Sequence, residues 1–141
     1  MNQTIKELFD RKSVRVYTGD PITQEERRLI LESALQAPTA GNMTLYSIID
    51  VQEQALKEEL SVLCDNQPFI AKAPLALVFL ADYQKWYDIF RAYGKEEPHI
   101  EESDLFLASQ DCLIAAQNAV VAAQSMGIGS CYIGDILENF E

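Results

Sequence analysis

Histidine and cationic side chains are scarce in this 141-residue sequence, and both shortages exclude functions. The single histidine, His99, has no second histidine with which to build a zinc site or a proton relay. Lysine and arginine number 11 against 22 aspartate and glutamate residues, which gives a net charge of −11. Such a chain repels nucleic acid and anionic membranes. We therefore expect no metal site and neither nucleic acid nor membrane as a partner.

Cysteine is also infrequent, and the spacing of the cysteines indicates the cellular compartment in which the protein works. Cys64, Cys112 and Cys131 are odd in number, lie far apart and show no CxxC spacing. Free thiols of this kind are typical of a reducing compartment. The first residues, 1–4, contain no apolar stretch of the kind that signal peptides carry. We therefore predict a cytoplasmic protein.

The common catalytic motifs are missing as well. The sequence has no GxSxG, no GxGxxG after a predicted strand and no P-loop. Apolar residues make up 48% and charged residues 23%, an ordinary balance for one globular domain with a single core. Either the chain is not an enzyme, or a bound cofactor carries the chemistry.

Local patterns predict an α+β domain. Thr4 with Glu7, and Thr23 with Glu26, have the spacing of capping boxes that open two helices, the second running to about residue 36. Further helices are expected over residues 53–64, 83–93 and 105–126, and strands over residues 46–51, 75–81 and 130–133. The unbroken apolar run at 75–81 is typical of a strand buried on both faces. Helices alternate irregularly with few strands, which favours α+β over a doubly wound sheet.

The helix predicted over residues 105–126 is apolar nearly all round. Polar residues interrupt it before the roughly 18 apolar residues of a membrane span are reached. These residues recur every seven positions and form one stripe, which consists of Gln110, Gln117 and Gln124 with Asp111, Asn118 and Ser125. The stripe fits either a subunit interface or a central core helix whose polar groups bond to neighbouring loops.

One cationic cluster stands out on this acidic chain. Arg11-Lys12-Ser13-Val14-Arg15 holds three of the eleven cations, which suggests a small anionic ligand or else a solvated basic turn. Following a short first helix, it resembles the Arg-x-Ser-x-(Arg/Lys) motif that opens flavoproteins of the nitroreductase family. Three later segments resemble further FMN-binding segments of that family, in the family's order. We name the four segments I (residues 11–15), II (37–42), III (66–69) and IV (127–135).

The resemblance implies roles for segment I. Arg11 would lie toward the FMN phosphate and ribityl chain, and the Ser13 hydroxyl would donate to either group. Arg15 would lie near the pyrimidine edge, where a cation stabilises the charge that builds at N1/O2 and raises the flavin's potential. The alternative for Arg15 is a surface ion pair. Together with Lys12, these arginines would supply nearly all the positive charge for FMN.

The resemblance also implies contacts from segments II to IV. Segment II would touch FMN bound mainly to the other subunit of a homodimer, through Pro38, Thr39, Ala40 and Asn42. Either of two segment III residues would hydrogen-bond the isoalloxazine edge, namely Asn66 or Gln67. Segment IV would line the flavin face near N5, through Ile133, Gly134 and Asp135. The alternatives are a helix C-terminal turn for segment II, a polar loop for segment III and a strand-end turn for segment IV.

The family resemblance implies a fold and an activity. The fold would be nitroreductase-like, with a small mixed or antiparallel sheet flanked by helices and the long helix at the dimer interface. FMN would take a hydride at N5 from NAD(P)H and pass electrons, in ping-pong fashion, to a nitroaromatic, quinone or similar conjugated acceptor. The flavin carries this chemistry, so no catalytic protein residue is expected. The alternatives are a non-catalytic flavin-binding or interaction domain, or a relative with dehalogenase or flavin-destructase chemistry.

Two further expectations concern particular segments. The aromatic residues of 83–93 would cover the open face of the flavin, unless they serve only helix packing. Family members normally continue past this point with a strand, a basic pair and a C-terminal arm, whereas no lysine or arginine follows Lys95 here. We therefore expect residues 1–141 to form one domain of a partial chain that lacks this C-terminal strand and arm, rather than a shortened member of the family.

Overall fold

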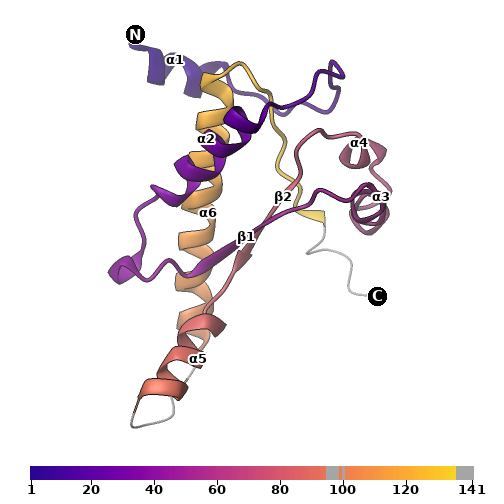
Figure 1. Cartoon of the computed structure of the whole chain (residues 1–141). Helices are drawn as coiled ribbons and strands as arrows, with labels where there is room; N and C mark the ends of the chain where they lie inside the picture. The colour runs from indigo at the N-terminus through magenta and orange to yellow at the C-terminus, as the bar shows by residue number, and fades with distance from the viewer. Residues whose placement is uncertain (95–98, 100, 136–141) are drawn as a thin grey trace.

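The elements of the chain are arranged around one long helix (Figure 1). The computed structural model describes residues 1–94, 99 and 101–135. In chain order the elements are α1 (Gln3–Asp10), α2 (Gln24–Leu35), the 3-10 helix η1 (Ala40–Asn42), β1 (Tyr46–Asp50), α3 (Gln54–Leu63), α4 (Pro68–Ala71), β2 (Leu77–Ala81), α5 (Gln84–Tyr93) and α6 (Glu102–Ser125). Helices flank a small antiparallel sheet, which confirms the α+β prediction.

Small side chains on α6 build the core. Ala119 and Ala123 lie in one buried cluster with Ile30 and Ala34 of α2. Because alanine is small, the two helices pack closely along their length. By length and composition alone, the 24 residues of α6 would suffice for a membrane span, but its buried side belongs to this core. The helix ends at Ser125, and Gly127 follows two residues later with a φ of 78°, a conformation that suits glycine after a helix end.

The sheet has only one covered face. Ile48 and Phe79 face each other across β1 and β2 and pack against the core. Ile49 and Leu80, the next residues in each strand, are exposed. The expectation that residues 75–81 form a strand buried on both faces is therefore wrong. The described sheet has two strands, and α6 and its neighbours cover one side of it, so an apolar run did not guarantee burial on both faces.

The helix caps agree with the sequence at one position and differ at another. Thr23 accepts from the Glu26 amide at 3.2 Å, and the Glu26 carboxylate accepts from the Thr23 amide at 2.7 Å, so this capping box is confirmed. The box expected at Thr4 is wrong. Asn2 caps α1 instead and accepts from the Ile5 amide at 3.0 Å. Asparagine caps helices at least as well as threonine, and it stands two residues earlier in the chain.

Two segments near the long helix also differ from expectation. Residues 130–133 do not form a strand, because segment I pairs with them only at a parallel bridge between Ser13 and Ser130. Helix α6 begins at Glu102, earlier than the expected residue 105, since Glu101 and Asp104 form a capping box that starts it. Residues 95–98 and 100 lie outside the described part of the chain, and His99 is exposed.

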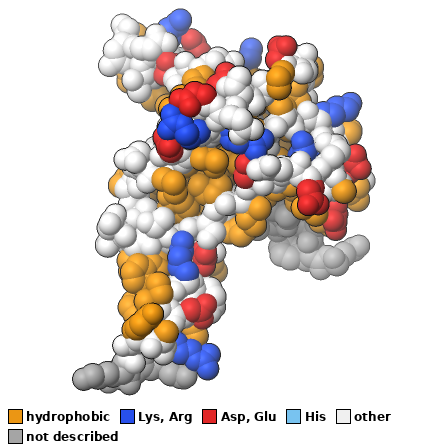
Figure 2. Space-filling view, viewed as in Figure 1, with side chains coloured by type: hydrophobic (Ala, Val, Ile, Leu, Met, Phe, Trp, Pro, Cys, Tyr) orange, Lys and Arg blue, Asp and Glu red, His pale blue; other side chains and the backbone are white. Residues whose placement is uncertain are grey.

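Hydrophobic side chains remain uncovered at one end of the molecule. Figure 2 shows them gathered where α5 and the start of α6 lie. Phe106 is 67% and Tyr93 87% exposed. Trp86 packs on Phe90, with ring centroids 5.6 Å apart, and its indole N–H donates to the Met43 carbonyl at 2.6 Å. Helix packing therefore accounts for Trp86, whereas the exposed aromatics leave a surface open to a partner.

Candidate functional site

Segments I and IV lie side by side. Ser13 and Ser130 form the parallel bridge, and the Val14 amide donates to the Ser130 carbonyl at 3.0 Å. Gly129 makes this approach possible, because a Cβ at that position would lie 2.6 Å from Cγ2 of Val14. The sequence places Gly129 in segment IV but does not indicate this contact. Its packing role depends on a neighbour more than a hundred residues away, which no local pattern reveals.

Segment III joins the other two through side chains. The Gln67 amide nitrogen donates to the Cys64 carbonyl at 2.9 Å and to the Asp135 carboxylate at 2.7 Å. The Arg15 guanidinium lies 5.9 Å from the centre of the Phe69 ring. Both amide hydrogens of Gln67 are thus engaged, and its carbonyl oxygen is the atom left to accept from a ligand. Asn66 is exposed.

The cations of segment I lack anionic partners within the described residues. The Arg11 guanidinium lies 5.6 Å from the centre of the Tyr132 ring, and its buried Nε has no hydrogen-bond partner there. By contrast, Arg27 and Arg28 both form ion pairs at 2.6 Å. The alternative of a surface ion pair for Arg15 is not supported in this part of the chain, because the guanidinium lies over Phe69. A half-buried guanidinium without a counter-charge fits an anionic group such as a phosphate.

Two tyrosines lie at these segments, Tyr132 within segment IV and Tyr17 just after segment I. Burial raises the pKa of Tyr132, against the opposing effect of Arg11. Burial, with Cys131 adding to it, also raises the pKa of Tyr17, and Arg15 opposes this. Both phenols therefore stay protonated near neutral pH. The Tyr132 hydroxyl donates to Gln117 at 3.2 Å.

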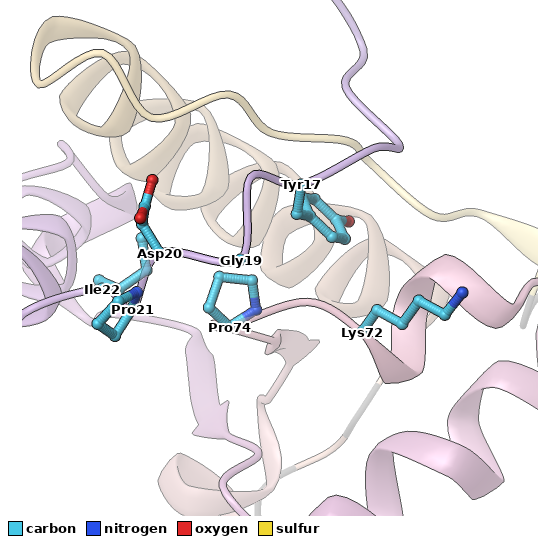
Figure 3. A pocket seen from close by; sticks show the side chains of 7 residues that line it. All are labelled: Tyr17, Gly19, Asp20, Pro21, Ile22, Lys72 and Pro74. Carbon is cyan, nitrogen blue, oxygen red and sulfur yellow. The ribbon is translucent and has the colours of Figure 1, made fainter.

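A pocket of about 350 Å³ borders the site (Figure 3). Its lining consists of Tyr17, Gly19, Asp20, Pro21, Ile22, Lys72 and Pro74. None of these residues was predicted to bind cofactor. In Figure 3 the Tyr17 ring and the Lys72 side chain lie toward one end and Asp20 toward the other. We locate the candidate site at segments I, III and IV rather than in this pocket, because the cations of segment I and the Gln67–Asp135 hydrogen bond lie there.

Segment IV presents an open surface. Gly134 is exposed, and a Cβ built there would meet no atom of the described residues within 4 Å. Ile133 and Asp135 on either side are half-buried. The backbone at Gly134 is therefore accessible to a ligand from outside the chain.

Segment II lies apart from the other three. It follows α2 and leads into β1, on the side of α6 away from segment IV (Figure 1). The amide of Ala40 donates to Asp111 in α6 at 3.0 Å, and Pro38 and Asn42 are exposed. Within one chain, segment II therefore does not lie at the same site as segments I, III and IV. This arrangement agrees with the expectation that segment II serves FMN bound to another subunit, which stays a prediction.

Comparison with known proteins identifies the class. The model of the nitroreductase family matches residues 8–139, and the chain belongs to this family. It is 38% identical to an FMN reductase (NADPH) of Bacillus subtilis over 96% of this chain and 55% of that protein. It is 32% identical to an oxygen-insensitive NADPH nitroreductase of Salmonella typhimurium, over all of this chain and 57% of the relative.

A solved structure supports the same fold. NfrA1 of B. megaterium superposes with a TM-score of 0.92 at 34% identity, over 98% of this chain and 57% of that one. The predicted nitroreductase-like fold is thereby confirmed. The chain spans little more than half the length of the relatives it matches.

Proposed function

We propose that this chain binds FMN and acts as an NAD(P)H-dependent oxidoreductase. The observation that carries the proposal is the convergence of segments I, III and IV around cations without counter-charges. Two relatives support it by name, an FMN reductase (NADPH) and an NADPH nitroreductase. When bound, FMN would supply the redox chemistry, accepting a hydride from NAD(P)H and returning electrons to a second substrate.

The residues fit parts of FMN by their chemistry. Arg11 and Lys12 supply charge for the phosphate, and the Ser13 hydroxyl supplies a donor for the phosphate or ribityl chain. Arg15 would sit at the pyrimidine edge, where a cation stabilises the negative charge that builds when the flavin is reduced. The carbonyl oxygen of Gln67 suits the single N–H donor of that edge, because both amide hydrogens of Gln67 are already used.

Segment IV would complete the contact at the reactive side of the ring. The open backbone at Gly134 admits the flavin edge without a side chain in the way. The Asp135 carboxylate, through its bond to Gln67, holds segments III and IV together. No side chain in this set needs to donate or remove a proton for the chemistry, in keeping with a cofactor-borne reaction.

A homodimer is part of the proposal. Segment II lies away from the other segments in one chain, and exposed apolar side chains remain on α5 and α6. A second subunit would cover these side chains and bring its segment II to the flavin. We further propose a conjugated small molecule, such as a nitroaromatic or a quinone, as acceptor, and a cytoplasmic location in keeping with the free thiols of Cys112 and Cys131.

Flavin binding tests the site. The chain is titrated with FMN while flavin fluorescence is followed, beside two variants that each remove one positive charge, Arg11→Ala and Arg28→Ala. Charge-assisted hydrogen bonds contribute roughly 1.5–3 kcal/mol, so loss of the Arg11 guanidinium should weaken FMN binding at least about tenfold. Arg28 is paired with glutamates on α2, and its removal should leave the affinity unchanged. Equal effects of the two variants, or failure of the unaltered chain to bind FMN, would reject the proposal.

A further inference from the structure

We propose that Asp111, in α6, is a positioning residue that holds segment II in a preformed cofactor-binding shape. The inference rests on the proposed function, since segment II matters only if the protein binds FMN. It concerns a buried carboxylate that none of the implied cofactor contacts includes. Three observations carry it, namely the hydrogen bonds of the carboxylate, the backbone conformation of the loop and a second anchor from α5.

The first observation is how the carboxylate is used. Asp111 is 3% exposed. One carboxylate oxygen accepts from the Ala40 amide at 3.0 Å, and the other accepts from the Leu45 amide at 3.3 Å. Among the described residues these partners are backbone N–H groups at the two ends of one loop, not a cation. Burying a carboxylate is costly unless it is hydrogen-bonded. Here both oxygens of Asp111 accept from backbone N–H groups, which would otherwise lack an acceptor.

The second observation is backbone strain between these two anchor points. Gly41, Asn42 and Thr44 all have positive φ angles, of 56°, 58° and 54°. The left-handed region is costly for residues other than glycine, and for a β-branched residue such as threonine most of all. Strained backbone of this kind persists where the surrounding structure over-determines it, and it gathers at ligand-binding sites. Asp111 is buried and binds the backbone on both sides of these strained residues, at Ala40 and at Leu45.

The third observation is the second anchor. The Trp86 indole on α5 donates to the Met43 carbonyl at 2.6 Å. The Thr39 hydroxyl accepts from the Thr44 amide at 3.2 Å, which closes the loop on itself. With its backbone groups held from inside, the loop presents Asn42 outward, where the side chain is exposed. A ligand from a second subunit would then meet a loop that needs no further ordering, which is how preorganisation raises affinity.

Asn118 offers a matched control on the same polar stripe. It stands seven residues after Asp111 and faces α2, where its amide donates to the Ser33 carbonyl at 3.2 Å. Asn118→Ala therefore removes a helix-to-helix hydrogen bond without touching segment II. Both variants should lower thermal stability, so a stability loss alone does not separate the two roles.

The test compares Asp111→Asn with Asn118→Ala in the full chain. FMN affinity is measured by fluorescence titration, and amide hydrogen exchange is measured across residues 38–45. We expect Asp111→Asn to weaken FMN binding at least about tenfold and to speed exchange at the Ala40 and Leu45 amides. Asn118→Ala should change neither beyond about twofold. Adding Thr44→Gly to Asp111→Asn should restore part of the affinity, because glycine adopts positive φ without strain.

The outcomes are distinguishable. If the unaltered chain fails to bind FMN, the proposed function fails, and the inference that rests on it falls as well. If the unaltered chain binds FMN but both variants weaken binding to the same degree, Asp111 is only structural and the inference is overturned while the proposed function stands. If Asp111→Asn does not fold, Asp111→Glu keeps the charge but shifts the two oxygens by one methylene, and it is judged by the same affinity and exchange criteria.

Discussion

Gly129 and Gly134 stand in the same segment, yet alanine should affect them in opposite ways. A Cβ at Gly129 would lie 2.6 Å from Cγ2, 3.0 Å from Cβ and 3.2 Å from Cγ1 of Val14. Valine has little χ1 freedom, and its Cβ moves only with the backbone. The bridge between segments I and IV would have to separate. Overpacking of this kind costs about 1–3 kcal/mol, so Gly129→Ala should lower the free energy of unfolding by that amount.

Gly134→Ala should instead leave folding unchanged. A Cβ there meets no atom of the described part of the chain within 4 Å, and the backbone does not require glycine. If the flavin lies against this position, however, the new methyl group occupies the space of the ligand. We therefore expect Gly134→Ala to weaken FMN binding while the free energy of unfolding stays within about 0.5 kcal/mol of the unaltered chain.

The assay is urea unfolding followed by circular dichroism, together with FMN titration of each variant. A double-mutant cycle with Val14→Ala isolates the contact, because the smaller residue removes both methyl groups that Gly129→Ala would meet. The double variant should recover part of the stability lost by Gly129→Ala. Unchanged stability of Gly129→Ala, or an unchanged FMN affinity of Gly134→Ala, would refute the reasoning for that position.

Three further predictions follow from single groups. Arg15→Ala should lower the potential of bound FMN more than Arg11→Ala does, by on the order of 30 mV in spectroelectrochemical titration, and equal potentials would refute the role of Arg15 at the pyrimidine edge. Thr23→Ala should lower the free energy of unfolding by about 1 kcal/mol, whereas Thr4→Ala, which removes no cap, should cost little in the same urea titration. Burial raises the pKa of Tyr46 above its ordinary value of 10.0, so the stability due to its neutral form is present below pH 10 and is lost as the pH rises further. Tyr46→Phe should therefore flatten the decline of the melting temperature above about pH 10, and an equally steep decline would contradict this.

Much of the fold follows from local sequence patterns, and the predictions that were wrong have physical causes. The box at Thr23 and the glycine after α6 are short-range features that sequence alone reveals. A strand forms within residues 75–81, as expected. The sequence does not show that, among the described residues, it pairs with one other strand, or that only one face of the resulting sheet is covered. Apolar residues report a tendency to be buried, and the neighbours decide whether burial occurs.

The candidate site was predictable in its parts and not in its geometry. The order of the four segments indicated the family, and the structure brings three of them together. Asp111 appeared only as one polar position on a helical stripe, because its partner Ala40 is 71 residues away. Of the two interpretations of that stripe, the structure supports the one in which its polar groups bond to neighbouring segments, and the subunit interface stays a prediction. Asp111 and Asn118 bond to neighbouring segments, while Leu113 and other apolar side chains of the same helix remain exposed.

Anaerobic titration of the FMN-loaded chain with NADPH, and separately with NADH, tests the central claim most directly. The FMN-loaded protein should be yellow, and at least one nicotinamide should bleach its visible absorption in a stoichiometric titration, with the colour returning when a quinone or a nitroaromatic is added. Protein that stays yellow with both nicotinamides would contradict the oxidoreductase proposal and leave a non-catalytic flavin-binding domain. Protein that takes up no FMN would contradict the flavin site itself.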